Sequence, residues 1–409
     1  MPTGITYHAN ALGPLRNVVW TVPAGVSAIV GPNRVGKSAL LRLPEFLRIA
    51  VNSDLETSVR DVFRGSAFLR NFTLPASASC TVGLSIATQD VPQKIKWTIE
   101  LMPKGATVVP FPAERVMLDD VTVFERKFGS DSASADGEQY KLGSNLIPRF
   151  CVIDLVRLQN PPDIPQAQIW TNHIANPKTR HRALAGLVCA SAHRSASYRT
   201  YEYQIQHLLR YGSPQSAATV LQSSGENVFP LLRNWRDQSE LEPRYEFVLD
   251  TLREAFPHVQ KFDFESSGQT VTIATVDRRW STKTPIAYES TGLITALLQL
   301  CAVASASSDS TITIDELETS LHPHAIRVLI AAFRRWAREH DLRIVLATQS
   351  ETVLDQFRDE PEKIFVMEAR QETSPQPLTE MFGADWLKQF SLGDLFSHLE
   401  FGAPDLPQG

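Results

Sequence analysis

The chain has 409 residues, enough for two or three domains, and its 43% hydrophobic and 21% charged residues are typical of a soluble globular protein. Its net charge of −5 at pH 7 excludes a global basic field of the kind that attracts nucleic acid. Any contact with nucleic acid must therefore be local.

The four cysteines, Cys80, Cys151, Cys189 and Cys301, are widely spaced and form no C-x-x-C pair. This spacing predicts reduced, buried side chains in a cytoplasmic protein. The first residues lack the basic and apolar segments of a signal peptide, and no apolar run reaches the ~20 residues of a membrane helix. We therefore expect a cytoplasmic chain without a membrane partner.

The first predicted elements are short strands around residues 5–7 and 16–20, then a buried strand over 26–30. Residues 31–38, G-P-N-R-V-G-K-S, follow this strand and open a helical pattern, which is the context of a phosphate loop. Gly31 and Gly36 permit close backbone approach, and the loop amides cradle phosphates at a helix N-terminus. Lys37 then reaches the terminal phosphates, and the Ser38 hydroxyl is a ligand for Mg²⁺.

Alternating polar and apolar residues over 81–86 and 94–100 predict a half-exposed antiparallel pair of strands. A polar loop is expected at 130–137 and a proline-rich turn at 160–164, after which residues 165–255 have mostly helical patterns. Basic residues are concentrated over 178–210, where the single acid is Glu202. This segment predicts either a DNA-binding patch or, slightly favoured, a solvated helix face. The basic residues are Lys178, Arg180, Arg182, Arg194, Arg199 and Arg210.

Residues 227–236 and 244–256 show helical patterns, and 259–276 reads as a β-hairpin. Within it, Asp263 and Glu265 resemble part of a nuclease metal site. No third acid accompanies them, so a solvent-facing strand edge is the favoured interpretation and no intrinsic nuclease is expected.

The second half of a nucleotide site follows in the last third of the chain. Ser290 and Gly292 precede a helix over 294–304, which is another anion-binding arrangement. The β-rich run 310–316 ends in Asp315 and Glu316, a Walker B pattern in which Asp315 faces Mg²⁺ and Glu316 orients or deprotonates water. The buried strand over 343–348 ends at Gln349, where a γ-phosphate sensor would lie.

The order GPNRVGKS, ESTGL, TITIDELETSLHP and LATQS resembles an ABC-type ATPase head of the SMC/RecF/OLD superfamily. Among such heads it is most similar to OLD-like ATPases of bacterial anti-phage systems such as Gabija, Septu and PARIS. The resemblance covers roughly residues 1–100 and 257–370. It implies an α/β P-loop NTPase fold, with a mixed or parallel sheet core, an antiparallel β subdomain and a mostly helical insertion.

The resemblance also implies ATP and Mg²⁺ as cofactors, with Ser38 and Asp315 as metal ligands and Glu316 with Gln349 as catalytic residues. It implies that Ser290 and Gly292 cover the γ-phosphate of a second copy, and that residues 318–321 form the D-loop at the dimer seam. The cofactor-binding set is Gly31, Asn33, Arg34, Gly36, Lys37, Ser38, Ala39, Ser290 and Gly292.

The sequence departs from the family pattern in three ways. Arg34 stands where a small glycine is common. The family's signature motif, here Ser290 to Gly292, is shortened. Gln349 replaces a histidine of ABC transporters. Glutamine cannot become cationic, which predicts slow hydrolysis. A Q-loop residue is not assigned; Gln89 and Gln93 are the candidates.

We therefore expect four parts: an ATPase lobe over 1–105, an insertion over 106–256, a second lobe over 257–370 and a tail over 371–409. The predicted function is an ATP-driven homodimeric or higher-order switch for a separate effector protein. The alternatives are a RecF-like DNA-binding ATPase and, less favoured, a transporter ATPase.

Overall fold

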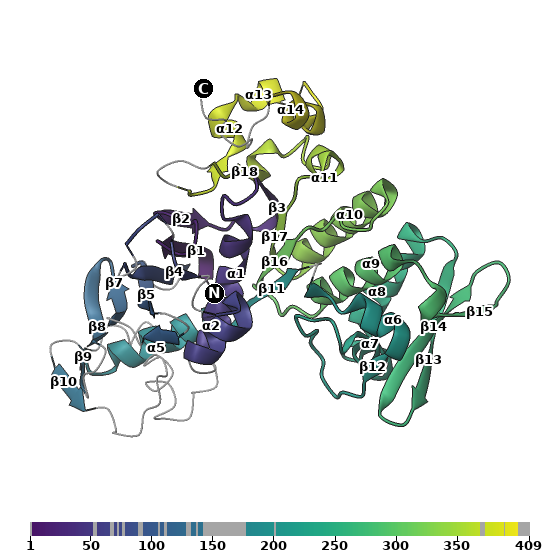
Figure 1. Cartoon of the computed structure of the whole chain (residues 1–409), viewed down its shortest axis with the longest axis horizontal. Helices are drawn as coiled ribbons and strands as arrows, with labels where there is room; N and C mark the ends of the chain where they lie inside the picture. Colours follow the sequence, from purple (N-terminus) through teal and green to yellow (C-terminus); the bar gives the residue numbers. More distant parts are fainter. Residues whose placement is uncertain are drawn as a thin grey trace.

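A computed structural model describes most of the chain. The described residues are 2–51, 55–65, 69–71, 73–75, 78–88, 93–104, 107–109, 113–127, 132–135, 138–141, 177–199, 202–368, 373–387 and 389–399. They form three β-sheets with helices between and around them (Figure 1).

The central sheet is built from strands that lie far apart in the sequence. Its order is β11-β16-β17-β3-β18-β19, and the first five strands are parallel. Their bounds are Ser195–Arg199, Thr311–Asp315, Arg343–Ala347, Gly25–Val30, Ile364–Val366 and Gln376–Pro377. The strands β16 and β17 are buried along their whole length, as expected of parallel strands covered on both faces.

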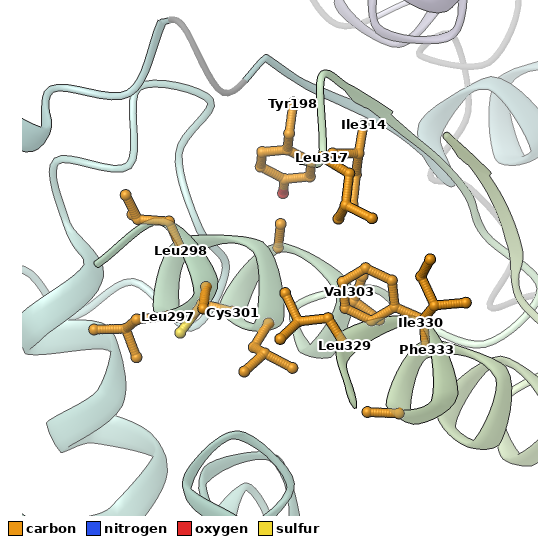
Figure 2. Close-up of a cluster of buried hydrophobic side chains, with 14 of the residues drawn as sticks. Tyr198, Leu297, Leu298, Cys301, Val303, Ile314, Leu317, Leu329, Ile330 and Phe333 are labelled. Atoms are coloured by element: carbon orange, nitrogen blue, oxygen red, sulfur yellow. The ribbon is translucent and has the colours of Figure 1, made fainter. Parts of the chain in front are cut away.

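Helices cover both faces of this sheet. Helix α1 (Lys37–Ala50) packs against β11 and β16, while α10 (Pro323–Glu339) packs against β3 and α9 (Thr291–Ala304). Figure 2 shows the core that α9 and α10 form with β11 and β16 on one face of the sheet. Its labelled side chains are Tyr198, Leu297, Leu298, Cys301, Val303, Ile314, Leu317, Leu329, Ile330 and Phe333.

A second, antiparallel sheet has the order β10-β9-β8-β7-β5-β4-β1-β2, with β6 beside β5. In chain order β1, β2 and β4–β10 are Pro2–Asn10, Val18–Thr21, Cys80–Thr88, Ile95–Lys104, Thr107–Val109, Ala113–Leu118, Val121–Lys127, Ser132–Ala135 and Glu138–Lys141. This sheet shares a core with α1, α2 (Leu55–Phe63) and α5 (Pro177–His193). The predicted fold class, a parallel core with an antiparallel β subdomain, is confirmed.

A third, smaller sheet lies in a lobe that shares its hydrophobic core with α9 and α10 (Figure 1). Its order is β12-β14-β13, with β15 beside β14. The strands β12–β15 are Ser213–Pro214, Val259–Ser267, Thr270–Asp277 and Lys283–Pro285, and α6–α8 are Ile205–Tyr211, Val228–Asp237 and Glu242–Ala255. The 3-10 turn η3 (Ile286–Tyr288) connects β15 to α9.

The last described helices pack near the end of the central sheet. They are α11 (Glu351–Asp355), α12 (Leu378–Met381), α13 (Ala384–Leu387) and α14 (Leu392–Leu399), with the turn η4 (Pro361–Lys363). The Asp355 carboxylate accepts the Ser391 hydroxyl and the Gly393 amide, which ties α14 to α11. The tail is thereby joined to the helix that follows Gln349, the predicted γ-phosphate sensor, which we call the switch residue.

The structure distributes residues 106–256 over three places instead of gathering them in one insertion. Strands β7–β10 extend the antiparallel sheet, β11 joins the central sheet beside β16, and α6–α8 belong to the third sheet's lobe. The strand β11 was not predicted, because its Ser-Ala-Ser-Tyr-Arg sequence lacks a long apolar run. The predicted turn at 160–164 and Cys151 lie outside the described residues.

Of the described helices, none has the length and apolar character needed to cross a membrane. The predicted polar loop at 130–137 includes the strand β9, which pairs with β8 and β10.

Candidate functional site

The phosphate loop lies between β3 and α1, as predicted. The Lys37 ammonium donates to the carbonyls of Gly31 and Pro32, the latter at 2.9 Å, so it lies over its own loop. Burial lowers the pKa of Lys37, while the nearby carboxylates of Asp315, Glu316 and Glu318 oppose that shift. The side chain that is expected to meet phosphates is therefore already close to the acidic end of β16.

At two positions of this loop, close contacts with neighbouring residues leave no room for a Cβ atom, so only glycine fits. Gly36 has φ +112°, and a Cβ there would lie 2.5 Å from a methyl group of Leu15. At Gly31 a Cβ would lie 2.3 Å from the Met367 carbonyl oxygen, which follows β18. A side chain at either position would displace the loop.

Arg34, at the tip of the loop, has φ +69° and an exposed side chain. A non-glycine residue in this left-handed region carries backbone strain. Asn33 and Arg34 are both exposed, so the tip of the loop faces outward.

The metal-binding pair that the sequence predicts comes together. Ser38 donates its hydroxyl to Asp315, and Asp315 is only 4% exposed. Burial raises the pKa of Asp315, while Ser38, Lys37, Arg42 and Arg199 act in the opposite direction. A hydroxyl and a carboxylate oxygen are ligands that Mg²⁺ prefers, so this pair fits the predicted ion.

Glu316 follows the strand with φ +58° and an exposed side chain. Partial burial and the neighbouring carboxylates of Asp315 and Glu318 raise the pKa of Glu316. Its backbone amide donates to the Ala347 carbonyl at 3.1 Å, which fixes it against β17.

The predicted switch residue contacts the phosphate loop directly. The Gln349 side-chain amide donates to the Asn33 side-chain oxygen at 2.7 Å. Beneath it, the Glu318 carboxylate accepts the Thr348 hydroxyl at 2.8 Å and the Gln349 backbone amide at 3.1 Å. The phosphate loop, the D-loop and the end of β17 thus form one hydrogen-bonded chain.

Glu318 was expected only as a D-loop residue, and sequence reasoning missed this supporting contact. The second acid in D-E-L-E, two residues after Glu316, is the signal that could have indicated it.

The predicted signature lies at the N-terminus of α9. The Ser290 hydroxyl caps the helix by accepting the Leu293 amide at 3.2 Å. A Cβ on Gly292 would lie 2.6 Å from the Ser320 carbonyl oxygen. The signature therefore touches the D-loop of its own chain.

Among the described side chains of the basic segment 178–210, two arginines pair with acids and so do not add free charge to a basic surface patch. Arg199 is 4% exposed and pairs with Glu45 on α1 at 3.1 Å and with Glu202. Arg194 pairs with Asp309 at 3.2 Å. The side chains of Lys178 and Arg182 are not among those described. Arg199 also lies opposite Asp315 in the parallel register, a structural role that its charge alone did not indicate.

The remaining candidates have ordinary surroundings. Asp263 forms an ion pair with Lys283 on β15, which agrees with the strand-edge interpretation. Gln93 is exposed, and Gln89 lies outside the described residues. Among the described side chains, no group of three or more His, Cys, Asp and Glu residues is arranged to hold a metal ion.

Residues 189–355 match the family model described as "AAA domain, putative AbiEii toxin, Type IV TA system". The chain is thus similar to an AAA-type ATPase. This agrees with the coarser part of the predicted resemblance, the similarity to an AAA-type ATPase. The matched segment contains the signature, Walker B and switch residues, while the phosphate loop precedes it. No curated protein matches the sequence.

The solved structures that are similar to the chain include three SMC heads. They are an Smc head with an extended coiled coil bound to the ScpA C-terminal domain from Pyrococcus furiosus, an SmcHead bound to the ScpA C-winged helix domain, and an SMC head from Thermotoga maritima. Their identities are 11, 10 and 12%, and their TM-scores are 0.47, 0.49 and 0.42. The matches cover 95, 93 and 91% of this chain and 99, 99 and 98% of those chains.

Proposed function

We propose that this chain is an ABC-type ATPase that binds ATP with Mg²⁺, hydrolyses it slowly and dimerises around it. The observation that carries the proposal is the convergence of Lys37, Ser38 and Asp315 at the carboxyl edge of the central sheet, with Gln349 bonded to Asn33. Ligands of open α/β sheets bind at this edge.

Each residue has a role that its surroundings support. Lys37 would leave its loop carbonyls to contact the terminal phosphates, and Ser38 with Asp315 would hold Mg²⁺. Gln349 moves from Asn33 to a γ-phosphate or an attacking water, for which its amide supplies both a donor and an acceptor. Glu316, with a raised pKa and an exposed carboxylate, orients or deprotonates the water.

Dimerisation is proposed because the chain carries one phosphate loop and one signature. The Ser290 hydroxyl and the helix N-terminus behind it suit an anion, whereas the charged side chains Lys37 and Asp315 lie at the phosphate loop. Two copies related by a two-fold axis would place each signature over the ATP held by the other, which is an isologous arrangement.

We further propose that the ATP-dependent dimer acts as a switch or sensor for a separate effector protein in bacterial anti-phage defence. The motif resemblance and the toxin named in the matched family model support this assignment. The ion pair between Asp263 and Lys283 also favours placing any nuclease activity on another chain.

The test uses Glu316→Gln, which keeps the side-chain shape but removes the base. The variant should retain ATP and accumulate as a dimer, measured by light scattering with ATP-Mg²⁺ and with ADP-Mg²⁺. Hydrolysis should fall by roughly 10²–10⁴-fold, the usual contribution of a general base. A Ser290→Arg variant is the matched control, because it blocks the signature and should prevent the mass increase.

An unchanged mass with ATP contradicts the dimer proposal if the protein is monomeric without nucleotide. If it is already oligomeric, a spin-label pair on the two heads must move closer with ATP. Failure to bind ATP at all would overturn the ATPase assignment itself.

A further inference from the structure

The turn between β14 and β15 lies at the outer edge of the third sheet's lobe (Figure 1) and contains Trp280. Trp280 is 76% exposed, and every residue from Arg278 to Lys283 is exposed. An exposed tryptophan leaves a large apolar surface in water, and such a surface commonly marks an interaction site.

This turn is held firmly by its own hydrogen bonds. The Asp277 carboxylate accepts the backbone amides of Arg279 at 2.7 Å and Trp280 at 2.9 Å. The Asp277 backbone donates to Thr282 and accepts from Ser281, at 2.9 and 3.0 Å. Because the backbone is fixed in this way, little conformational entropy remains to be lost when a ligand contacts Trp280.

Arg278 and Arg279, the two residues before the tryptophan, add positive charge to the turn. Among the described residues, neither Arg278 nor Arg279 has an acidic side chain within ion-pair distance, whereas Lys283 pairs with Asp263. The nearest acid in sequence, Asp277, is occupied by the backbone amides of the turn. The tip therefore combines two exposed arginines with an exposed indole.

We propose that this turn binds single-stranded nucleic acid, with Trp280 stacking on a base and Arg278 and Arg279 contacting phosphates. A nucleic-acid strand supplies an aromatic face beside negative charge, which is the chemistry that this tip complements. The tryptophan of a protein–protein hot spot lies in a well-packed, desolvated pocket, whereas the neighbours of Trp280 are exposed and polar. The inference goes beyond the proposed ATPase and does not depend on ATP binding.

The location differs from segment 178–210, for which the sequence predicts either a DNA-binding patch or, slightly favoured, a solvated helix face. In segment 178–210, Arg194 and Arg199 are engaged by Asp309, Glu45 and Glu202. The exposed arginines of the turn are separated from that segment in sequence by some 70 residues, as the numbering of Arg210 and Arg278 gives.

The experiment measures fluorescence anisotropy of labelled oligothymidine and oligouridine, each of about 20 nucleotides, with the full-length chain in the absence of nucleotide. Trp280→Ala should weaken binding by about tenfold or more, because one base–aromatic stack contributes that much. Trp280→Phe should restore part of the loss, and the matched control Trp386→Ala, which changes another exposed tryptophan, should leave binding unchanged.

The double variant Arg278→Ala/Arg279→Ala should reduce the slope of log affinity against log salt by about 1.4, at ~0.7 per phosphate contact in single strands. The control Arg338→Ala/Arg358→Ala, which removes two other exposed arginines, should preserve the slope. The inference is overturned if wild type binds neither oligonucleotide at low salt, or if Trp280→Ala equals wild type. It is also overturned if a polyglutamate peptide competes as well as the oligonucleotide does.

Discussion

Two loops of this chain place small and hydroxyl residues at the start of a buried helix, yet their surroundings differ. The phosphate loop opens α1, and the signature opens α9. Around the first, Lys37, Ser38 and Asp315 interact at the edge of the central sheet. In the second, the Ser290 hydroxyl is used by its own helix and Gly292 is pressed against the Ser320 carbonyl.

The comparison shows that a helix N-terminus alone makes only part of a phosphate site. The phosphate loop gains its charges from neighbouring strands, because the carboxyl ends of β3, β16 and β17 meet at one edge of the sheet. The signature lies outside these strand ends, where its own chain supplies a hydroxyl and backbone amides. This difference supports assigning it to ATP that another copy holds.

The largest effect is expected for Lys37→Ala. The variant should fold normally and lose ATP affinity by about a hundredfold or more, since each hydrogen bond to a charged group contributes ~1.5–3 kcal/mol. Isothermal titration calorimetry measures the affinity, and circular dichroism checks the fold.

Lys363→Ala is the matched control for this change, because the Lys363 ammonium also donates to a backbone carbonyl, that of Ala24. It should bind ATP as wild type does. Unchanged affinity in Lys37→Ala would mean that the phosphate loop is not the nucleotide site.

A pair of glycine substitutions compares the two loops directly. Both Gly31→Ala and Gly292→Ala force a methyl group against a backbone carbonyl, at Met367 and Ser320 respectively. Each should cost about 1–3 kcal/mol of stability through overpacking. Only Gly31→Ala should lower the ATP affinity of the monomer, whereas Gly292→Ala should abolish the ATP-dependent dimer.

Gly383→Ala is the control for this pair, since a Cβ there meets no atom within 4 Å. It should leave stability, ATP affinity and dimerisation unchanged. If Gly292→Ala also weakened ATP binding to the monomer, the signature would belong to the site of its own chain.

The residue pattern within one short segment was sufficient to predict those parts of the candidate site that lie on one loop or one strand. The glycines and Lys37 follow a recognisable loop pattern, and Asp315 and Glu316 end an obvious buried strand. Their arrangement follows from the rule that parallel strands bring their carboxyl ends together. The alternation over 81–100 likewise predicted β4 and β5 as an antiparallel pair.

Contacts between segments that lie far apart in the sequence could not be predicted from such short patterns. Arg199 looked like part of a basic patch, because the acid that neutralises it, Glu45, is 154 residues away on α1. The strand β11 was missed since its stability comes from pairing with β16, and its sequence has little apolar pattern of its own. The same reason applies to the bond between Gln349 and Asn33, which are 316 residues apart.

Gln349→His should change the turnover rate several-fold with little effect on ATP affinity. Wild-type turnover is expected near or below the low end of the usual ~1–10³ s⁻¹ range, because glutamine cannot become cationic beside the γ-phosphate. A phosphate-release assay measures the rate, with Gln356→His, whose amide bonds the Thr352 carbonyl, as the matched control. A wild-type rate in the hundreds per second would refute slow hydrolysis.

The smallest effect concerns Arg34, which occupies a backbone conformation that suits glycine. With φ +69°, the arginine carries strain of about 1 kcal/mol that Arg34→Gly should release, partly offset by the flexibility of glycine in the unfolded chain. The melting temperature should therefore rise by roughly 1–2 °C, while ATP affinity falls because a cation is lost at the tip of the phosphate loop. Asp341→Gly, at φ +53°, is the control and should stabilise less, since aspartate tolerates this region better.

A rise in melting temperature with unchanged ATP affinity would show that the arginine does not contact the nucleotide. A fall in both the melting temperature and the ATP affinity would mean that the Arg34 guanidinium stabilises the phosphate loop itself. The phosphate loop and the signature would then differ in what stabilises their backbones as well as in charge.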